Sequence, residues 1–155
     1  MLEVSAEMRF VENGYLSIET HRDRPAIVRF FLSAEPPDPQ AGVHAARRIR
    51  YIARFNDRDA ALMHVHEVLK RRLIDPDAHL YRVPVEHAIA AAESLDLRHK
   101  RIYVDTEFGD DAHASIAAFT ERFRRNARRK EIFFQTLGYI GIGMLLFNLF
   151  FLSFP

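Results

Sequence analysis

The stretch IFFQTLGYIGIGMLLFNLFFLSF, residues 132–154, is an uncharged apolar run near the C-terminal end of the chain. As an α-helix rising about 1.5 Å per residue it would reach about 34 Å, more than the roughly 30 Å hydrocarbon core of a bilayer. It is longer and more uniformly apolar than a typical core helix. The run predicts a single transmembrane helix, and the sequence indicates an anchor more clearly than it indicates an activity.

A basic segment directly precedes this run and predicts the topology of the chain. Six cations and no acidic residue occupy residues 122–130: Arg122, Arg124, Arg125, Arg128, Arg129 and Lys130. Such a collar normally stays on the cytoplasmic side, where anionic lipid attracts it. The first 14 residues lack the pattern of a signal peptide, so we expect the N-terminal part in the cytoplasm. Few lysines among the basic residues are typical of a GC-rich bacterial genome, and we expect the inner membrane.

The basic collar also accounts for the apparent basicity of the chain. Residues 1–121 carry sixteen basic against twenty acidic side chains, a net charge of −4, so the domain lacks the basic face of a nucleic-acid-binding protein. In a strand, Arg48, Arg50 and Arg54 would share one side, with Tyr51 and Phe55 on the other. We interpret these arginines as a solvated sheet face and as a candidate docking face for an acidic partner.

Residue patterns typical of catalysis are sparse. The chain has no cysteine, which excludes disulfides, thiolate metal sites and cysteine nucleophiles. His64 and His66 form the closest histidine pair, but positions i and i+2 of a helix diverge by about 200°. No serine lies in a GxSxG motif, and no glycine-rich phosphate loop occurs. A metal site built from distant residues such as His64, His79 and His87 stays open as an alternative, but we predict no catalytic, cofactor or metal site.

The N-terminal part has the strand and helix signals of a small α+β domain. Asn13-Gly14 is a strong hairpin signal between apolar runs, and Asp57 and Pro84 suit helix starts. The expected strands are residues 8–11, 15–19, 26–32, 48–55, 80–83 and 101–105, and the expected helices are 56–73 and 84–95. This order, β-β-β-β-α-β-α-β, predicts a mixed sheet covered by two helices. We assign residues 1–109 to this domain, 110–131 to a juxtamembrane helix and 132–154 to the transmembrane helix.

The last two segments read as one continuous helix of about 45 residues opened by Asp110-Asp111. Positions at 100° intervals place small and polar residues of the span on one side, where a second helix could approach closely. The predicted helix–helix interface consists of Phe134, Gly138, Gly141, Leu145 and Asn148. It continues the side of Ala112, Ile116, Phe119, Phe123 and Ala127. This earlier part could instead pack on the chain's own domain.

These patterns favour a non-catalytic, single-pass, tail-anchored accessory or assembly subunit of a larger integral-membrane complex; an energy-transducing complex is one candidate host. Its expected partners are integral-membrane subunits in a hetero-oligomer and membrane lipid, without nucleic acid. The alternative is a free-standing tail-anchored adaptor whose soluble domain binds a soluble protein or ligand. A membrane-tethered enzyme is a third class that ranks below these two.

Overall fold

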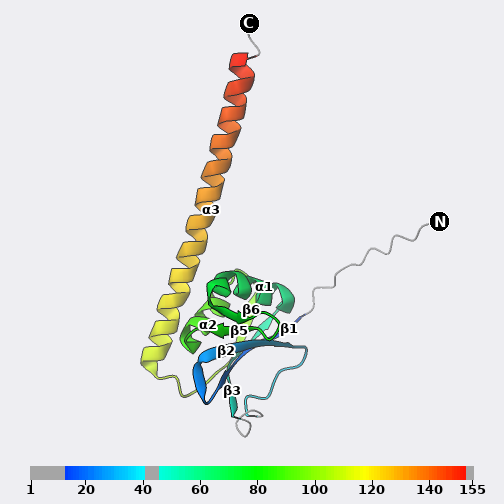
Figure 1. Ribbon diagram of the computed structural model, residues 1–155, viewed down its shortest axis with the longest axis vertical. Coiled ribbons are helices and arrows are strands. Elements are labelled where there is room, and N and C mark those ends of the chain that lie inside the picture. Colours follow the sequence, from blue (N-terminus) through cyan, green and yellow to red (C-terminus); the bar gives the residue numbers. More distant parts are fainter. Residues whose placement is uncertain (1–12, 41–45, 153–155) are drawn as a thin grey trace, which may run out of the picture.

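The computed structural model describes residues 13–40 and 46–152, and in it one six-stranded antiparallel sheet is accompanied by helices (Figure 1). The strands run in the order β4-β5-β2-β1-β3-β6. Their bounds are β1 Gly14–His21, β2 Arg24–Ser33, β3 Arg47–Phe55, β4 Leu73–Asp75, β5 Leu80–Arg82 and β6 His99–Val104. The helices are α1 Arg58–Leu69, the short 3₁₀ helix η1 Lys70–Arg72, α2 Val85–Glu93 and α3 Asp110–Leu152. The predicted α+β class is confirmed, but the sheet is antiparallel at every described strand pair and not mixed as expected.

Strand β1 lies at the centre of the sheet and pairs on both edges. Leu16 is opposite Leu32 of β2 and Ala53 of β3. The hairpin expected at Asn13-Gly14 is therefore wrong, because β1 has no free edge for a further strand, and Gly14 already belongs to β1. The predicted strand 8–11 lies outside the described residues. A two-residue turn instead joins β1 to β2, with His21 opposite Arg24.

Helix α1 begins where the sequence predicts and ends earlier than predicted. The Asp57 side chain caps it by accepting a hydrogen bond from the Ala60 backbone N–H at 2.8 Å. The helix was expected to reach Leu73, but Leu73 lies in β4 and pairs with Tyr81 of β5. Strand pairing thus takes Leu73 from the helix. After β4 the Asp75 carboxylate stabilises a turn by accepting hydrogen bonds from the backbone N–H groups of Asp77 and Ala78.

One hydrophobic core lies between the sheet and the two short helices, which share a face of it. Apolar side chains of alternate strand positions meet the inward sides of α1 and α2. The buried contributors include Leu16, Ile18, Val28, Phe30, Tyr51, Phe55, Ala61, Val65, Leu69, Tyr81, Ala88, Ile89 and Ala92. Phe30 and Tyr81 pack edge to face, with ring centroids 5.3 Å apart. This core gives the domain a fixed frame from which α3 departs.

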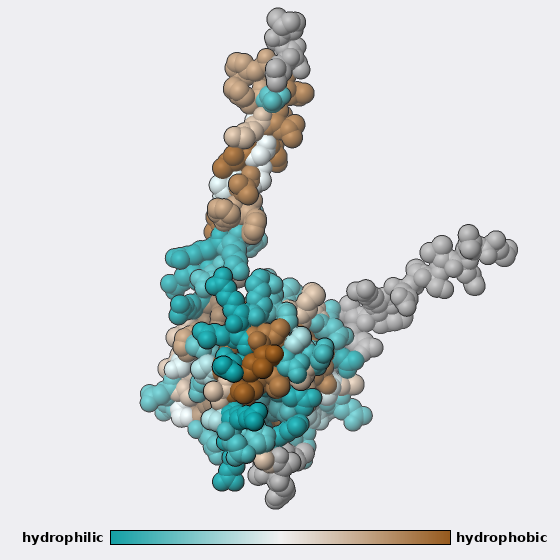
Figure 2. All heavy atoms as spheres, in the orientation of Figure 1, coloured by the Kyte–Doolittle hydropathy of each residue, from teal (hydrophilic) through white to brown (hydrophobic). Residues whose placement is uncertain are grey.

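Helix α3 is a single rod of 43 residues that leaves the domain as a stalk (Figure 1). In its first turns Ile116 and Thr120 are buried, and Phe119 and Phe123 pack against the core. Every side chain described from Ile132 onward is exposed. Figure 2 shows hydrophilic side chains between the domain and this apolar end. The helix is long and apolar enough to cross a membrane.

Candidate functional site: the junction between the domain and the long helix

An ion-pair cluster joins strand β3 to the segment that leads into α3. We call Arg48, Arg50, Asp105 and Glu107 the junction cluster. Arg48 Nη2 lies 2.6 Å from Asp105 Oδ1, and Arg50 Nη1 lies 2.8 Å from Asp105 Oδ2. Both arginines also pair with the exposed Glu107. The Asp105 side chain is fully buried, so a buried carboxylate with two cationic partners fixes the chain just after β6.

Backbone and ring contacts reinforce the same connection. The Asp105 backbone N–H donates to the Arg50 carbonyl at 2.9 Å, and the Arg50 guanidinium carbon lies 4.8 Å from the centroid of the buried Phe108 ring. The hydrogen bond from Arg48 lowers the pKa of the Glu107 carboxyl, and the Arg50 bond adds to this effect. The start of α3, two residues beyond Phe108, is thereby held in one place on the sheet.

The junction cluster uses two of the three arginines of the predicted docking face. Arg48 and Arg50 are ion-paired within the chain, whereas Arg54 is exposed and makes no ion pair within the described ranges. Arg54 is therefore the member of the three with a charge available to a partner. Docking through this face stays a prediction.

An apolar contact between α2 and α3 forms the second part of the junction. The His87 ring meets the Phe119 ring edge to face, with centroids 3.7 Å apart, and Ile116 lies against the domain core. Burial lowers the pKa of His87 below its ordinary 6.5; the charges of Arg122 and Arg72 act in the same direction and Glu86 opposes them. His87 is therefore neutral at pH 7 and packs as an aromatic group.

A hydrogen-bond network surrounds the half-buried Glu93 at the C-terminal end of α2. Glu93 Oε1 accepts hydrogen bonds from the Tyr51 hydroxyl at 2.7 Å and from Arg101 Nε at 2.8 Å. Burial raises the pKa of Glu93, but the bonds from Arg101 and Tyr51 outweigh burial and lower it. Burial raises the pKa of Tyr51, and the Glu93 carboxylate raises it further. Both groups keep one protonation state near neutrality, which is typical of a structural tie rather than of an acid–base pair.

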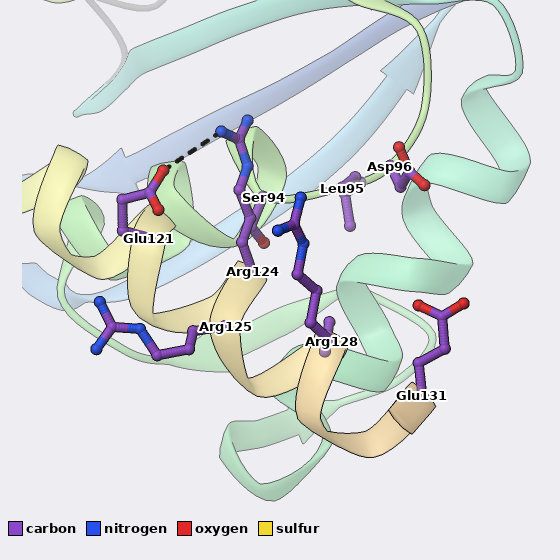
Figure 3. A pocket seen from close by; sticks show the side chains of 9 residues that line it. Ser94, Leu95, Asp96, Glu121, Arg124, Arg125, Arg128 and Glu131 are labelled. Atoms are coloured by element: carbon purple, nitrogen blue, oxygen red, sulfur yellow. Dashed lines mark ion pairs between the residues drawn. The ribbon is translucent and has the colours of Figure 1, made fainter. Parts of the chain in front are cut away.

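Beside the Glu93 network, a groove of about 630 Å³ runs between α3 and the loop that follows α2 (Figure 3). It is mostly charged, with three arginines and three acidic side chains. Its lining residues are Ser94, Leu95, Asp96, Glu121, Arg124, Arg125, Ala127, Arg128 and Glu131. Arg124 bridges the groove to α2, because its Nη2 donates to the Glu93 carbonyl oxygen at 3.1 Å.

The predicted helix–helix interface lies on the exposed end of α3. All five of its members, Phe134, Gly138, Gly141, Leu145 and Asn148, project from this segment. A Cβ placed on Gly138 or Gly141 would meet nothing within 4 Å, so a second helix could approach there. The continuation of this side toward the start of α3 packs on the chain's own domain through Ile116. The intramembrane contact stays a prediction.

The described histidines form no cluster suited to a metal ion, and His66 and His99 have local partners. In residues 13–40 and 46–152 no three His, Asp or Glu side chains are grouped to hold a metal ion. His66 Nδ1 lies 3.3 Å from the Tyr81 hydroxyl, and His99 stacks on Phe55.

Sequence reasoning missed Asp105 and Glu93. The only available signal was the pair of arginines on one side of β3 with an acidic residue directly after a neighbouring strand.

Comparison with known protein families, curated proteins and solved structures finds no match to this chain. Function is therefore inferred from the chain's own residues and their geometry.

Proposed function

We propose that the protein is a non-catalytic, single-pass accessory or assembly subunit of a larger integral-membrane complex, with α3 as its C-terminal anchor. The observation that carries this proposal is the continuity of α3. Its first turns bury Ile116 and Thr120 against the domain, while residues 132–151 of its last turns are all exposed and mostly apolar. Exposed apolar surface of this extent on a helix indicates burial in lipid or against other membrane helices.

The basic collar supports a cytoplasmic position for the domain. All six collar cations lie on α3 between the domain and the apolar end, and Figure 2 shows hydrophilic side chains at this level. The membrane potential and anionic lipid both oppose transfer of such a segment across the inner membrane. The domain would then sit against the cytoplasmic surface.

A fixed junction favours an accessory subunit over a free adaptor. An adaptor that captures soluble partners gains reach from a flexible linker, whereas this domain joins its anchor through the junction cluster and the His87–Phe119 contact. Such a connection sets the height and orientation of the domain relative to the membrane. That arrangement suits docking onto a neighbouring membrane subunit of fixed shape.

The exposed end of α3 offers the chemistry for that neighbour. Gly138 and Gly141 leave space for close backbone approach, and the Asn148 amide would form an interhelical hydrogen bond more favourably than it would sit in hydrocarbon. We infer that this side of α3 faces a partner helix and that the phenylalanine-rich opposite side faces lipid.

One observation favours the adaptor as a second candidate. A hollow of about 470 Å³ near the edge strand β4 is lined by Ile27, Ile74 and Leu80 together with charged side chains. Ile74 lies on that edge and is 43% exposed. A soluble protein could dock an apolar side chain there, with the charged rim setting its orientation.

Purification of the tagged full chain in mild detergent tests the proposal. We expect a discrete, stoichiometric set of integral-membrane proteins to co-purify. Gly141→Leu should reduce their recovery, and Phe150→Leu, on the opposite side of α3 at about 180° from Gly141 by helical spacing, should not. A stoichiometric soluble client would favour the adaptor, and recovery of the chain alone from native membranes would contradict the accessory-subunit proposal.

A further inference from the structure

The charged groove lies at a definite depth relative to the proposed membrane span. Arg128 precedes Ile132, the first residue of the apolar run, by four positions, or about 6 Å along a helix. The headgroup region of each leaflet is roughly 5–7 Å thick. When α3 spans the bilayer, the Arg128 end of the groove therefore lies at the level of the lipid phosphates, and Arg124, about 12 Å from the apolar run, lies on the aqueous side of that level.

Two arginines give one side of the groove the chemistry of a phosphate site. Figure 3 shows the Arg124 and Arg128 guanidinium groups extending from α3 toward the loop after α2, with Arg125 pointing away. Arg124 is held by the Glu93 carbonyl oxygen, and its Nη1 is 3.6 Å from Glu121. Arg128 makes no ion pair within the part of the chain described. Guanidinium groups bind phosphate oxygens through charge-assisted, often bidentate hydrogen bonds.

The opposite side of the groove has the chemistry of an ammonium site. It is formed by the carboxylates of Asp96, in the loop after α2, and of Glu131, both of them exposed. Asp96 and Glu131 make no ion pairs within residues 13–40 and 46–152. A purely anionic headgroup would meet three carboxylates in this groove. A zwitterionic headgroup can place its phosphate against the arginines and its ammonium group against the carboxylates.

We propose that this groove binds the headgroup of an aminophospholipid, a phosphodiester that carries a primary ammonium group. The phosphate lies between Arg124 and Arg128, and the ammonium group lies toward Asp96 and Glu131. Ile132 and Tyr139 continue the Arg128 side of α3 at helical spacing, and both are exposed, so the acyl chains can follow them into the bilayer. The inference rests on the proposed membrane anchorage.

Lipid selectivity tests the site in the full chain. The chain is reconstituted into vesicles of phosphatidylcholine, phosphatidylethanolamine and phosphatidylglycerol in equal parts, and its bound lipid is identified by native mass spectrometry. We expect phosphatidylethanolamine to be enriched roughly tenfold over phosphatidylglycerol, on the scale of one hydrogen bond to a charged group. The double variant Arg124→Gln/Arg128→Gln should lose this enrichment, and Asp96→Asn should shift it toward phosphatidylglycerol.

A matched control removes the same charge from the collar outside the groove. Arg122→Gln/Arg129→Gln should keep the enrichment, because neither residue lines the groove. Equal loss in both double variants, preference for phosphatidylglycerol in the unaltered chain, or displacement of the lipid by inorganic phosphate would overturn the proposal. All four side chains are exposed, so near-ultraviolet circular dichroism should show an unchanged fold in each variant.

Alkaline carbonate extraction of the same membranes separates this inference from the proposed function. A chain retained in the membrane without lipid selectivity refutes the groove site and leaves the anchorage standing. A chain released into the supernatant refutes the anchorage and the lipid site together.

Discussion

Replacing Asp105 with alanine should destabilise the domain more than any surface change near the junction. The substitution removes the buried carboxylate that pairs with both Arg48 and Arg50, and it also removes the acceptor of the Glu107 backbone N–H at 3.1 Å. Both guanidinium groups would retain only the exposed Glu107 carboxylate. The path from β6 into α3 would lose its main attachment to β3.

The size of the loss follows from the burial of the partners. Breaking a fully buried ion pair costs about 3–5 kcal/mol. The Asp105 side chain is fully buried, but the Arg50 and Arg48 side chains are 18% and 36% exposed, so both recover some hydration. We expect a loss of about 2–4 kcal/mol, a large part of the roughly 5–15 kcal/mol that stabilises a typical domain.

Urea unfolding of the full chain in mild detergent measures this loss. The near-ultraviolet circular dichroism of the buried Tyr51 and Tyr81 reports on the domain. The midpoint should fall by roughly 1–2 M, given a slope of about 2 kcal/mol/M. Asp96→Ala, an exposed aspartate, serves as control and should change stability by less than about 0.5 kcal/mol. A loss below about 1 kcal/mol for Asp105→Ala would refute the view that the junction cluster holds the start of α3.

Three further predictions test other parts of the structure. Gly14→Ala should cost about 1–3 kcal/mol, because its Cβ would lie 2.8 Å from the Ser33 carbonyl oxygen, whereas Gly109→Ala, with nothing within 4 Å, should not show this loss; urea titration compares them. The pKa of His87 is lower in the folded chain than its ordinary 6.5, so the unfolded chain binds the proton more readily, and the contribution of His87 is complete above pH 6.5 and declines below it; melting of His87→Gln should depend less on pH between 5 and 7. Gly141→Leu should weaken helix association in a bilayer more than Phe150→Leu, which lies on the opposite side of α3, as measured by energy transfer between labelled chains and partner subunits; equal effects would remove the oriented interface.

The regular elements were predictable because local patterns agree with the final packing. Strand alternation in residues 48–55, the Asp57 cap and the long apolar run each depend on neighbours in sequence. The continuity of α3 from Asp110 also follows from helical spacing without a breaker.

The errors arose where distant pairing decides the structure. Asn13-Gly14 carries a hairpin signal, but β2 and β3 occupy both edges of β1. Leu73 continues the helical spacing of α1, yet its pairing with Tyr81 places it in β4. Local propensity cannot predict these pairings, because they depend on residues distant in the sequence.

The candidate site was only partly visible in the sequence for the same reason. Arg48 and Arg50 were recognised as a basic sheet face, but Asp105 lies 57 positions from Arg48, and one sequence gives no sign that these residues meet. The groove likewise combines the loop after α2 with a distant part of α3. The basic residues of the collar are evident in the sequence. That acidic side chains line the same groove is evident only in the structure.

The topology of the anchor is the central claim, and cysteine labelling in intact cells tests it most directly. The chain has no native cysteine, and Met63 on α1 is 64% exposed, so Met63→Cys gives one accessible thiol on the domain. A membrane-impermeant maleimide should leave this thiol unmodified in intact cells, or in spheroplasts when an outer membrane is present, and should label it once the inner membrane is permeabilised. Labelling before permeabilisation would place the domain outside the cytoplasm and contradict the account.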